Sequence, residues 1–180
     1  MQLSSLTDEQ LVDHVRTKNR ETFSYLIRRY EQKLRRYATY LVNDEELAHD
    51  VVQQSFIKAF INLNSFDSKK KFSSWLYRIV HNEAMSLVRK HKIHQTLETA
   101  FAVAADQNIE DDFVKQELTS NLHDCVSQIP MMYKEPLTLF YLENKSYEEI
   151  SDILHIPVGT VGTRINRAKK MVKAVCQKKQ

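Results

Sequence analysis

Glycine and proline are almost absent from this sequence of 180 residues, which contains two glycines and three prolines. Because tight turns, hairpins and phosphate-cradling loops depend on these residue types, their scarcity argues against an all-β or glycine-loop-rich fold. Apolar residues instead recur with helical periodicity along most of the chain. The sequence therefore predicts an all-α protein, and its length suits one ordinary domain or two small ones.

Cysteines and long apolar runs are equally scarce. Cys125 and Cys176 stand far apart and in no metal-like spacing, so we expect two small, buried or half-buried residues without a disulfide framework. No segment approaches the 18 apolar residues of a membrane span, and residues 1–10 lack the pattern of a signal peptide. We therefore expect no membrane insertion and a cytoplasmic location.

The residue types that carry metal or catalytic chemistry form no recognisable pattern. His91 and His94, two of the seven histidines, lack a third ligand. The chain has no glycine-rich phosphate loop, no activated serine or cysteine and no acidic metal cluster. We expect no metal, no cofactor and no enzymatic activity.

The net charge of +3 is small, but the charges are unevenly distributed. Residues 164–180 contain seven lysines and arginines and no acid, whereas residues 95–114 contain five acids and no lysine or arginine. A basic tail beyond an acidic stretch is typical of a nucleic-acid-binding face joined to a solvated linker. A charged, soluble helix end is the alternative that this pattern leaves open.

The first half of the chain has the pattern of several amphipathic helices. Thr7 and Gln10 have the spacing of a capping box, which predicts a first helix. Residues 23–41 predict a second helix, Asn43 and Asp44 suit the N-cap of a third, and a fourth is expected over about residues 73–90. In that fourth helix we expect Trp75 to pack in the core and Tyr77 to be exposed.

The helical periodicity of the apolar residues is interrupted once, and this interruption divides the chain into two expected domains. We expect a first domain over residues 1–92, because its helices can bury one shared core. Residues 93–112 are polar and acidic and predict a flexible linker. Periodicity returns afterwards, so we expect a second domain over residues 113–180.

The strongest motif is a predicted helix-turn-helix over residues 146–170. Ser146 and Glu149 form a second capping box, and His155 and Pro157 mark the turn. The second of these helices is rich in Arg, Thr and Lys, as expected of a helix that enters the major groove of DNA. Its expected inward face consists of Val161, Ile165, Ala168 and Val172. Its expected outward face consists of Gly159, Thr160, Gly162, Thr163, Arg164, Asn166, Arg167 and Lys170. An ordinary helical hairpin with a basic surface is the alternative.

Four stretches of the sequence resemble the sigma-70 family, especially its extracytoplasmic-function (ECF) group. IPVGTVGTRINRAKK (156–170) is similar to the last DNA-binding element of the family, and residues 129–151 are similar to the stretch before it. AHDVVQQSFIKAF (48–60) resembles the polymerase-binding helix, and FSSWLYRIVHNEAMSLVRK (72–90) resembles the helix that melts and reads the minus-ten element. The matches occur in family order and cover both domains.

The resemblance implies a sigma factor that binds core RNA polymerase and directs initiation at specific promoters. Domain 2, in the first half, would capture the melted minus-ten strand, and domain 4, in the second, would read the minus-thirty-five duplex. Promoter DNA and core polymerase are the implied partners, with an anti-sigma factor as a further one. The sequence departs from the family pattern at Gln54, often Glu, at Phe60, often Trp, and at Gly162, usually basic.

The family roles fall on residues that also stand out physically. Asp50, Gln54, Ile57 and Ile61 form a stripe opposite the expected core, which favours a partner helix over plain solvent exposure. The candidate polymerase contacts are Asp50, Gln53, Gln54 and Ile57. The candidate minus-ten contacts are Lys70, Lys71, Arg78, His81, Asn82, Met85 and Arg89, types that suit phosphates and unstacked bases. The candidate minus-thirty-five contacts are Gly159, Thr160, Thr163, Arg164, Arg167 and Lys170.

Two other functions compete with this interpretation. A stand-alone helix-turn-helix regulator would bind duplex DNA by itself as a dimer. A protein-interaction module would use its helical faces for partners and have no role on DNA. The similarity of the first half to domain 2 argues against the regulator, and the basic last helix argues against the interaction module.

Overall fold

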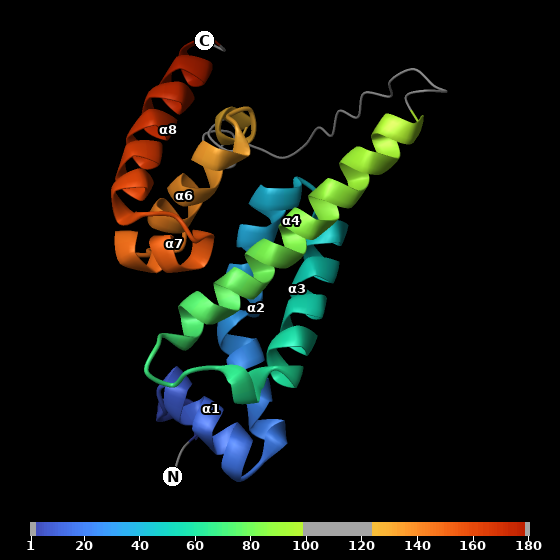
Figure 1. Cartoon of the computed structure of the whole chain (residues 1–180), viewed down its shortest axis with the longest axis vertical. Coiled ribbons are helices and arrows are strands. Elements are labelled where there is room, and N and C mark those ends of the chain that lie inside the picture. The colour runs from blue at the N-terminus through green and yellow to red at the C-terminus, as the bar shows by residue number, and fades with distance from the viewer. Residues whose placement is uncertain (1–2, 99–123, 179–180) are drawn as a thin grey trace, which may run out of the picture.

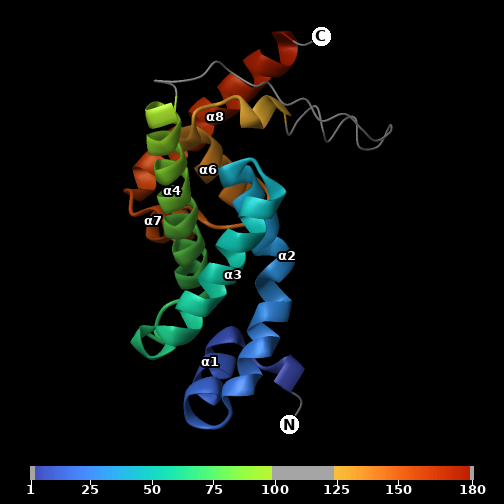
Figure 2. The same ribbon diagram turned by 90° about the vertical axis from the view of Figure 1, so that its right-hand side faces the viewer.

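A computed structural model describes residues 3–98 and 124–178, and all regular structure within these ranges is helical (Figure 1, Figure 2). This confirms the predicted all-α class. The elements are η1 (Leu3–Ser5), α1 (Asp8–Thr17), η2 (Arg20–Thr22), α2 (Phe23–Val42), α3 (Glu45–Ile61), η3 (Leu63–Ser65), α4 (Phe72–Glu98), α6 (Met131–Tyr141), α7 (Tyr147–Leu154) and α8 (Val158–Lys178). A short helical segment, 124–127, precedes α6.

The first half of the chain packs α2, α3 and α4 side by side around one core, with α1 across one end (Figure 1). Leu26 and Leu34 of α2 and Leu76 of α4 are fully buried in it. Each such side chain contributes about 1.5–3 kcal/mol to folding relative to an exposed one. The apolar face of each helix, at the predicted spacing, thus becomes the shared interior.

The helices begin and end at residues with local capping chemistry. Thr7 and Gln10 form the predicted capping box of α1, and Asp44 accepts a hydrogen bond from the backbone N–H of Leu47 at the start of α3. Asn43 ends α2 in the left-handed conformation, with φ of 56°. The turn between α2 and α3 is therefore made by two consecutive residues whose short polar side chains suit it.

The second half forms a smaller helical unit in which α7 and α8 are the predicted helix-turn-helix. Ser146 and Glu149 make the expected capping box at the start of α7. Val161, Ile165 and Ala168 of α8 are buried, as the spacing predicts, and Val172 is half-buried. His155 ends α7 with φ of 52°, in the left-handed conformation that glycine adopts most easily.

Three expectations from the sequence need correction or refinement. Helix α4 continues to Glu98 rather than ending near Lys90, so part of the predicted linker is helical, and residues 99–112 lie outside the described ranges. Tyr77 is buried, not exposed, because the second half of the chain covers that face of α4. The two cysteines form a disulfide, which their separation of 51 residues had concealed.

The left-handed His155 yields a stability prediction. Replacing it with glycine should raise the free energy of unfolding by about 0.5–1 kcal/mol, because glycine has no Cβ to strain this conformation. Thermal unfolding of the full chain should show a higher Tm. Asn144→Gly is the matched control, since Asn144 has φ of 51° but asparagine tolerates it better. A lower Tm for His155→Gly would contradict the argument.

Candidate nucleic-acid and polymerase interfaces

The exposed face of α8 gathers most of the residues predicted to read duplex DNA. Gly159, Thr160, Thr163, Arg164 and Arg167 line one hollow of about 330 Å³, and Lys170 is exposed further along the helix. Met132 and Tyr133 at the start of α6 close its other side. A Cβ added at Gly159 would meet nothing within 4 Å, so a large ligand can approach the backbone there.

Gly162 has a different role from its neighbours. A Cβ at this position would lie 3.2 Å from a ring carbon of Tyr147, so the backbone of α8 approaches α7 closely here. The Tyr147 ring packs in turn on Phe140, with ring centroids 5.2 Å apart. Gly162 is half-buried and therefore lies at the edge of the predicted outward face, where α8 meets α7.

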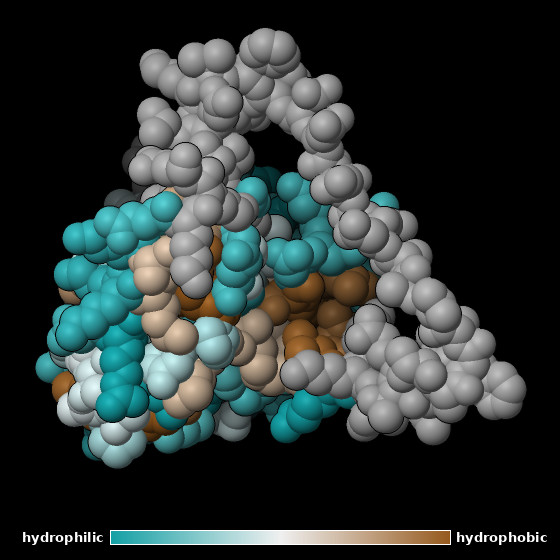
Figure 3. All heavy atoms as spheres, turned by 90° about the horizontal axis from the view of Figure 1, so that it is seen from above, coloured by the Kyte–Doolittle hydropathy of each residue, from teal (hydrophilic) through white to brown (hydrophobic). Residues whose placement is uncertain are grey.

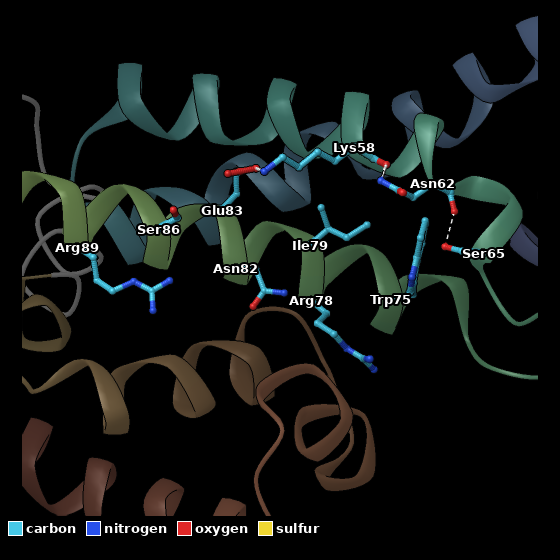
Figure 4. Close-up of a pocket in the computed structure, with 10 residues that line it drawn as sticks. All are labelled: Lys58, Asn62, Ser65, Trp75, Arg78, Ile79, Asn82, Glu83, Ser86 and Arg89. Carbon is cyan, nitrogen blue, oxygen red and sulfur yellow. Dashed lines mark hydrogen bonds and ion pairs between the residues drawn. The ribbon is translucent and has the colours of Figure 1, made fainter.

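A second candidate surface is a groove of about 530 Å³ between α3 and α4 (Figure 4). Arg78, Asn82 and Arg89, three of the predicted minus-ten contacts, line it together with Trp75 and Ile79. Trp75 is half-buried and stacks obliquely against Phe66 and Phe72, so it packs as predicted and also forms part of the groove wall. The groove combines cationic, amide and aromatic groups, the set that binds phosphates and unstacked bases.

The remaining minus-ten candidates occupy different surroundings. Lys70 and Lys71 are exposed before α4, and Met85 is half-buried on it. His81 lies on the side of α4 that faces the second half of the chain. The predicted residues thus do not form one surface: Asn82 and Arg89 line the groove, His81 faces the second half, and Arg78 takes part in both.

Acidic side chains of the second half bind three of the predicted minus-ten residues. Lys71 pairs with Glu149 at 3.1 Å, Arg78 with Asp152 at 2.5 Å, and His81 with Glu135 at 2.5 Å. The carboxylates come from α6 and α7, which pack against α2 and α4. In this closed arrangement, carboxylate groups contact three side chains, two of them always cationic, that the sequence assigns to DNA phosphates.

Two further contacts lie in the buried centre of this interface. The hydroxyl of Tyr37 donates to Glu135 at 2.6 Å, and the hydroxyl of Tyr77 donates to Glu143 at 2.5 Å. Burial, together with the adjacent carboxylate, raises the pKa of Tyr37 and Tyr77 well above the ordinary tyrosine value. Both phenols therefore stay protonated and act only as donors. Arg36 of α2 completes the charge balance by pairing with Glu143 at 2.8 Å.

The interface also desolvates two lysines of the second half. Burial lowers the pKa of both Lys134 and Lys145, although nearby glutamates oppose the change. The Lys145 ammonium lies 4.5 Å from the centroid of the Tyr77 ring, a cation–π contact across the interface. Polar and charged contacts thus accompany apolar packing between the halves, since the buried apolar residues of both belong to one cluster.

Sequence reasoning missed the acidic half of this interface. Glu135 and Glu143 lie eight residues apart, and both are buried, which is rare for unpaired glutamates. The only signal was that Glu135 lies inside the otherwise apolar periodicity of residues 129–142 and that Glu143 directly follows it. Their partners, Tyr37 and Tyr77, are about a hundred and about seventy residues away in sequence, so no local pattern linked them.

The third candidate surface is the outward face of α3. Asp50, Gln53, Gln54 and Ile57 are all exposed, and Ile57 has 51% of its surface accessible. Ile61, one turn further, is 69% exposed. Beside this stripe, Ile57 and Gln53 line a shallow hollow between α2 and α3 with Ile27 and Phe56. An exposed apolar row beside acid and amide groups fits a partner helix better than water.

Comparison with known proteins assigns the chain to a family. The model of sigma-70 region 2 matches residues 26–93, and that of sigma-70 region 4 matches residues 119–172. Among curated proteins, the ECF RNA polymerase sigma factor SigW of Bacillus subtilis is 31% identical over 90% of this chain and 92% of its own. The ECF sigma-E factor of Haemophilus influenzae is 34% identical over 93% of this chain and 94% of its own.

This chain belongs to the ECF sigma factors of the sigma-70 family. The sigma factor therefore supports promoter-specific initiation of transcription, working with core RNA polymerase and promoter DNA, and is a transcription regulator rather than an enzyme. The predictions of family and activity class are confirmed. Within the described residues, no helix is long and apolar enough to cross a membrane, and no group of side chains could hold a metal ion.

Solved structures share the fold of this sigma factor. CnrH in complex with the cytosolic domain of CnrY matches with a TM-score of 0.75 and 23% identity over 96% of this chain and 99% of CnrH. RpoE from Bartonella quintana, in complex with the anti-sigma factor NepR, matches with a TM-score of 0.75 and 21% identity over 86% of this chain and 96% of RpoE. Both halves of the chain are thus arranged as in known structures.

The buried carboxylates lead to a prediction about the closed arrangement. Replacing both Glu135 and Glu143 with glutamine should open the sigma factor, because charge-assisted hydrogen bonds contribute about 1.5–3 kcal/mol each. Small-angle scattering should then give a larger radius of gyration. Glu148→Gln is the control, since Glu148 is exposed on α7 and makes no contact with the first half. An unchanged radius for the double variant would show that apolar packing alone holds the halves together.

Proposed function

We propose that this sigma factor reads a promoter with two separate faces, while a third face holds core polymerase. The face of α8 reads the minus-thirty-five duplex, the groove along α4 captures the melted minus-ten strand, and the stripe on α3 binds the polymerase. The convergence of five predicted DNA contacts in the α8 hollow is the single observation that best supports this proposal.

The α8 face suits duplex DNA for geometric reasons. Thr160 lies in the first turn of the helix, where the helix dipole favours phosphate, and Thr163 lies one turn further along the same face. Arg164 and Arg167 lie one turn further along, at the position where guanidinium groups can reach base edges in the major groove. Lys170 would contact the backbone beyond them. The proposal gives the arginines the reading role and the other residues a positioning role.

Minus-ten capture requires the two halves to separate. Arg78 and His81 are paired with Asp152 and Glu135, so they are not available to a DNA strand in the closed arrangement. We infer that binding to polymerase, at sites on both halves, stabilises the open form, in which these side chains can contact the DNA strand. The linker then joins two weak DNA contacts, at the minus-ten and minus-thirty-five elements, so that together they bind a promoter of fixed spacing tightly.

The stripe on α3 is the proposed polymerase contact. Asp50, Gln53 and Gln54 would hydrogen-bond a partner helix while Ile57 packs on it, as a helix-in-groove contact requires. The resemblance to the family points to the coiled-coil clamp of the largest polymerase subunit as that partner. Because polymerase and DNA lie in the cytoplasm, the proposal implies that the sigma factor acts there.

An anti-sigma factor is a further proposed partner. NepR is named as an anti-sigma factor in its complex with RpoE, and CnrH binds the cytosolic domain of CnrY. Both RpoE and CnrH share this fold. A regulator that binds the closed form of this chain would keep Arg78 and His81 paired and so block promoter capture.

The polymerase contact can be tested with purified proteins. The double variant Asp50→Ala, Gln54→Ala should raise the Kd for core RNA polymerase about tenfold or more, because central polar contacts of an interface cost more than about 1 kcal/mol each when truncated. Gln32→Ala, an exposed amide on α2, should have no effect. If the double variant binds polymerase with wild-type affinity, the polymerase contact does not lie on this face of α3. No binding by the wild type, with tight binding to duplex DNA alone, would favour a stand-alone regulator.

The reading role of α8 predicts a specific pattern of DNA defects. With holoenzyme on promoters selected from a random library, Arg167→Ala should cost about 1–3 kcal/mol on an intact minus-thirty-five element and little on a scrambled one. Lys170→Ala should instead weaken both to a similar extent and reduce the salt dependence. Lys18→Ala, remote on the first half, serves as the control. If Arg167→Ala and Lys170→Ala lose the same binding free energy on both DNAs, Arg167 does not read bases.

A further inference from the structure

Two cysteines that the sequence left unconnected lie together in the folded chain. Cys125, just before α6, and Cys176, near the end of α8, are joined by a disulfide with their α-carbons 5.5 Å apart. This α-carbon distance is normal for a disulfide, so the bond can form without rearrangement of the backbone. Cys125 is only 1% exposed, whereas Cys176 is half-buried and therefore the more accessible of the two.

The bond lies at the end of α8 that does not carry the candidate DNA contacts. Those contacts run from Gly159 to Lys170, and Cys176 lies more than a turn beyond them. In between, Met171, Val172 and Val175 are only half-buried, so apolar packing holds this part of the helix less firmly than the part near Val161. The disulfide is consequently a strong covalent restraint on a weakly packed helix end.

Cys176 also borders an apolar groove that extends across both halves of the chain. The groove has a volume of about 570 Å³ and is lined by Tyr40 of α2, by Val126, Leu137 and Leu142, and by Val172 of α8. At this end of the molecule hydrophobic side chains gather in a hollow between hydrophilic surfaces (Figure 3). Lys169 and Lys173 line the same groove, so positive charge borders the accessible sulfur. Cationic surroundings are those in which cysteine sulfurs react as thiolates.

We propose that Cys125 and Cys176 form a reversible redox site, at which oxidation fixes the C-terminal end of α8 and reduction releases it. The proposal rests on the proposed function, because that function places the chain in the compartment of the polymerase. A factor that works with polymerase lies in a compartment where thiols are kept reduced, and disulfides there are mostly transient and redox-sensing rather than structural. Two cysteines that meet in the folded chain, one of them accessible, are more typical of a redox sensor than of a permanent crosslink.

The chemistry is thiol–disulfide exchange with a low-molecular-weight disulfide. The Cys176 thiolate attacks one sulfur of that disulfide, forms a mixed disulfide and expels one small thiolate. The Cys125 thiolate then attacks the Cys176 sulfur and expels the second. The two cysteines lose two electrons and two protons, and the small disulfide gains both as two thiols.

The two redox states should differ in the stability of the second half of the chain. Closing a loop of this length restricts the unfolded state, so the oxidised form should unfold at a temperature higher by about 5 °C or more. In the reduced form the end of α8 should become accessible to proteases, because only half-buried side chains then hold it. The residues of the α8 hollow are unaffected, since they lie on the other end of the helix.

The test uses the full chain equilibrated in glutathione buffers of increasing oxidation. Alkylation of free thiols and mass spectrometry measure the fraction of disulfide, and thermal unfolding is followed in parallel. We expect the loss of two thiols together, full reversal by reduced glutathione, and a Tm that rises with the disulfide fraction. Cys125→Ser and Cys176→Ser should each retain one thiol, or one mixed disulfide, and show no rise in Tm with oxidation.

Two results would overturn the proposal. One is the persistence of both thiols in the most oxidising buffer, and the other is a wild-type Tm that stays the same in all buffers. The assay contains neither polymerase nor DNA, so its failure leaves the proposed function intact. Conversely, a chain that fails to bind polymerase would still report its redox behaviour here.

Discussion

The arrangement of this sigma factor depends on two buried glutamates that join its halves. Glu135 and Glu143 project from the second half into the first, where each accepts a hydrogen bond from a buried tyrosine hydroxyl. A buried carboxylate without such partners would be strongly unfavourable, so the two halves must meet at these groups or separate entirely. The interface is therefore better suited to two states than to gradual loosening.

This interface is the link between the fold and the proposed mode of promoter recognition. The same acidic surface that covers Tyr77 also pairs with Arg78 and His81 of α4. Opening the halves would return these two side chains to solvent or to DNA, and closing them would pair them with carboxylates of the second half. A partner that binds differently to an open and a closed form can shift their populations without touching the candidate DNA contacts of α8.

The candidate surfaces differ in how far the sequence alone predicted them. The outward face of α8 can be predicted from the helical repeat alone. Val161, Ile165 and Ala168 point inward, and this determines which residues face outward. The α3 stripe follows for the same reason, and Ile57 and Ile61 are exposed as expected. Both predictions needed only local geometry. Their roles in binding DNA and polymerase remain proposals that rest on the family and on the side-chain types.

The sequence by itself determined the helices, their caps, the helix-turn-helix and the family, because these depend on residues within a few turns of one another. Only the tertiary structure decided that Tyr77 is buried, that Gly162 packs on Tyr147, and that three of the expected DNA contacts pair with carboxylates. The same holds for the disulfide between Cys125 and Cys176. The physical reason is common to all of them: each depends on which faces of distant helices meet, and helical periodicity shows that a face is apolar or charged without naming its partner.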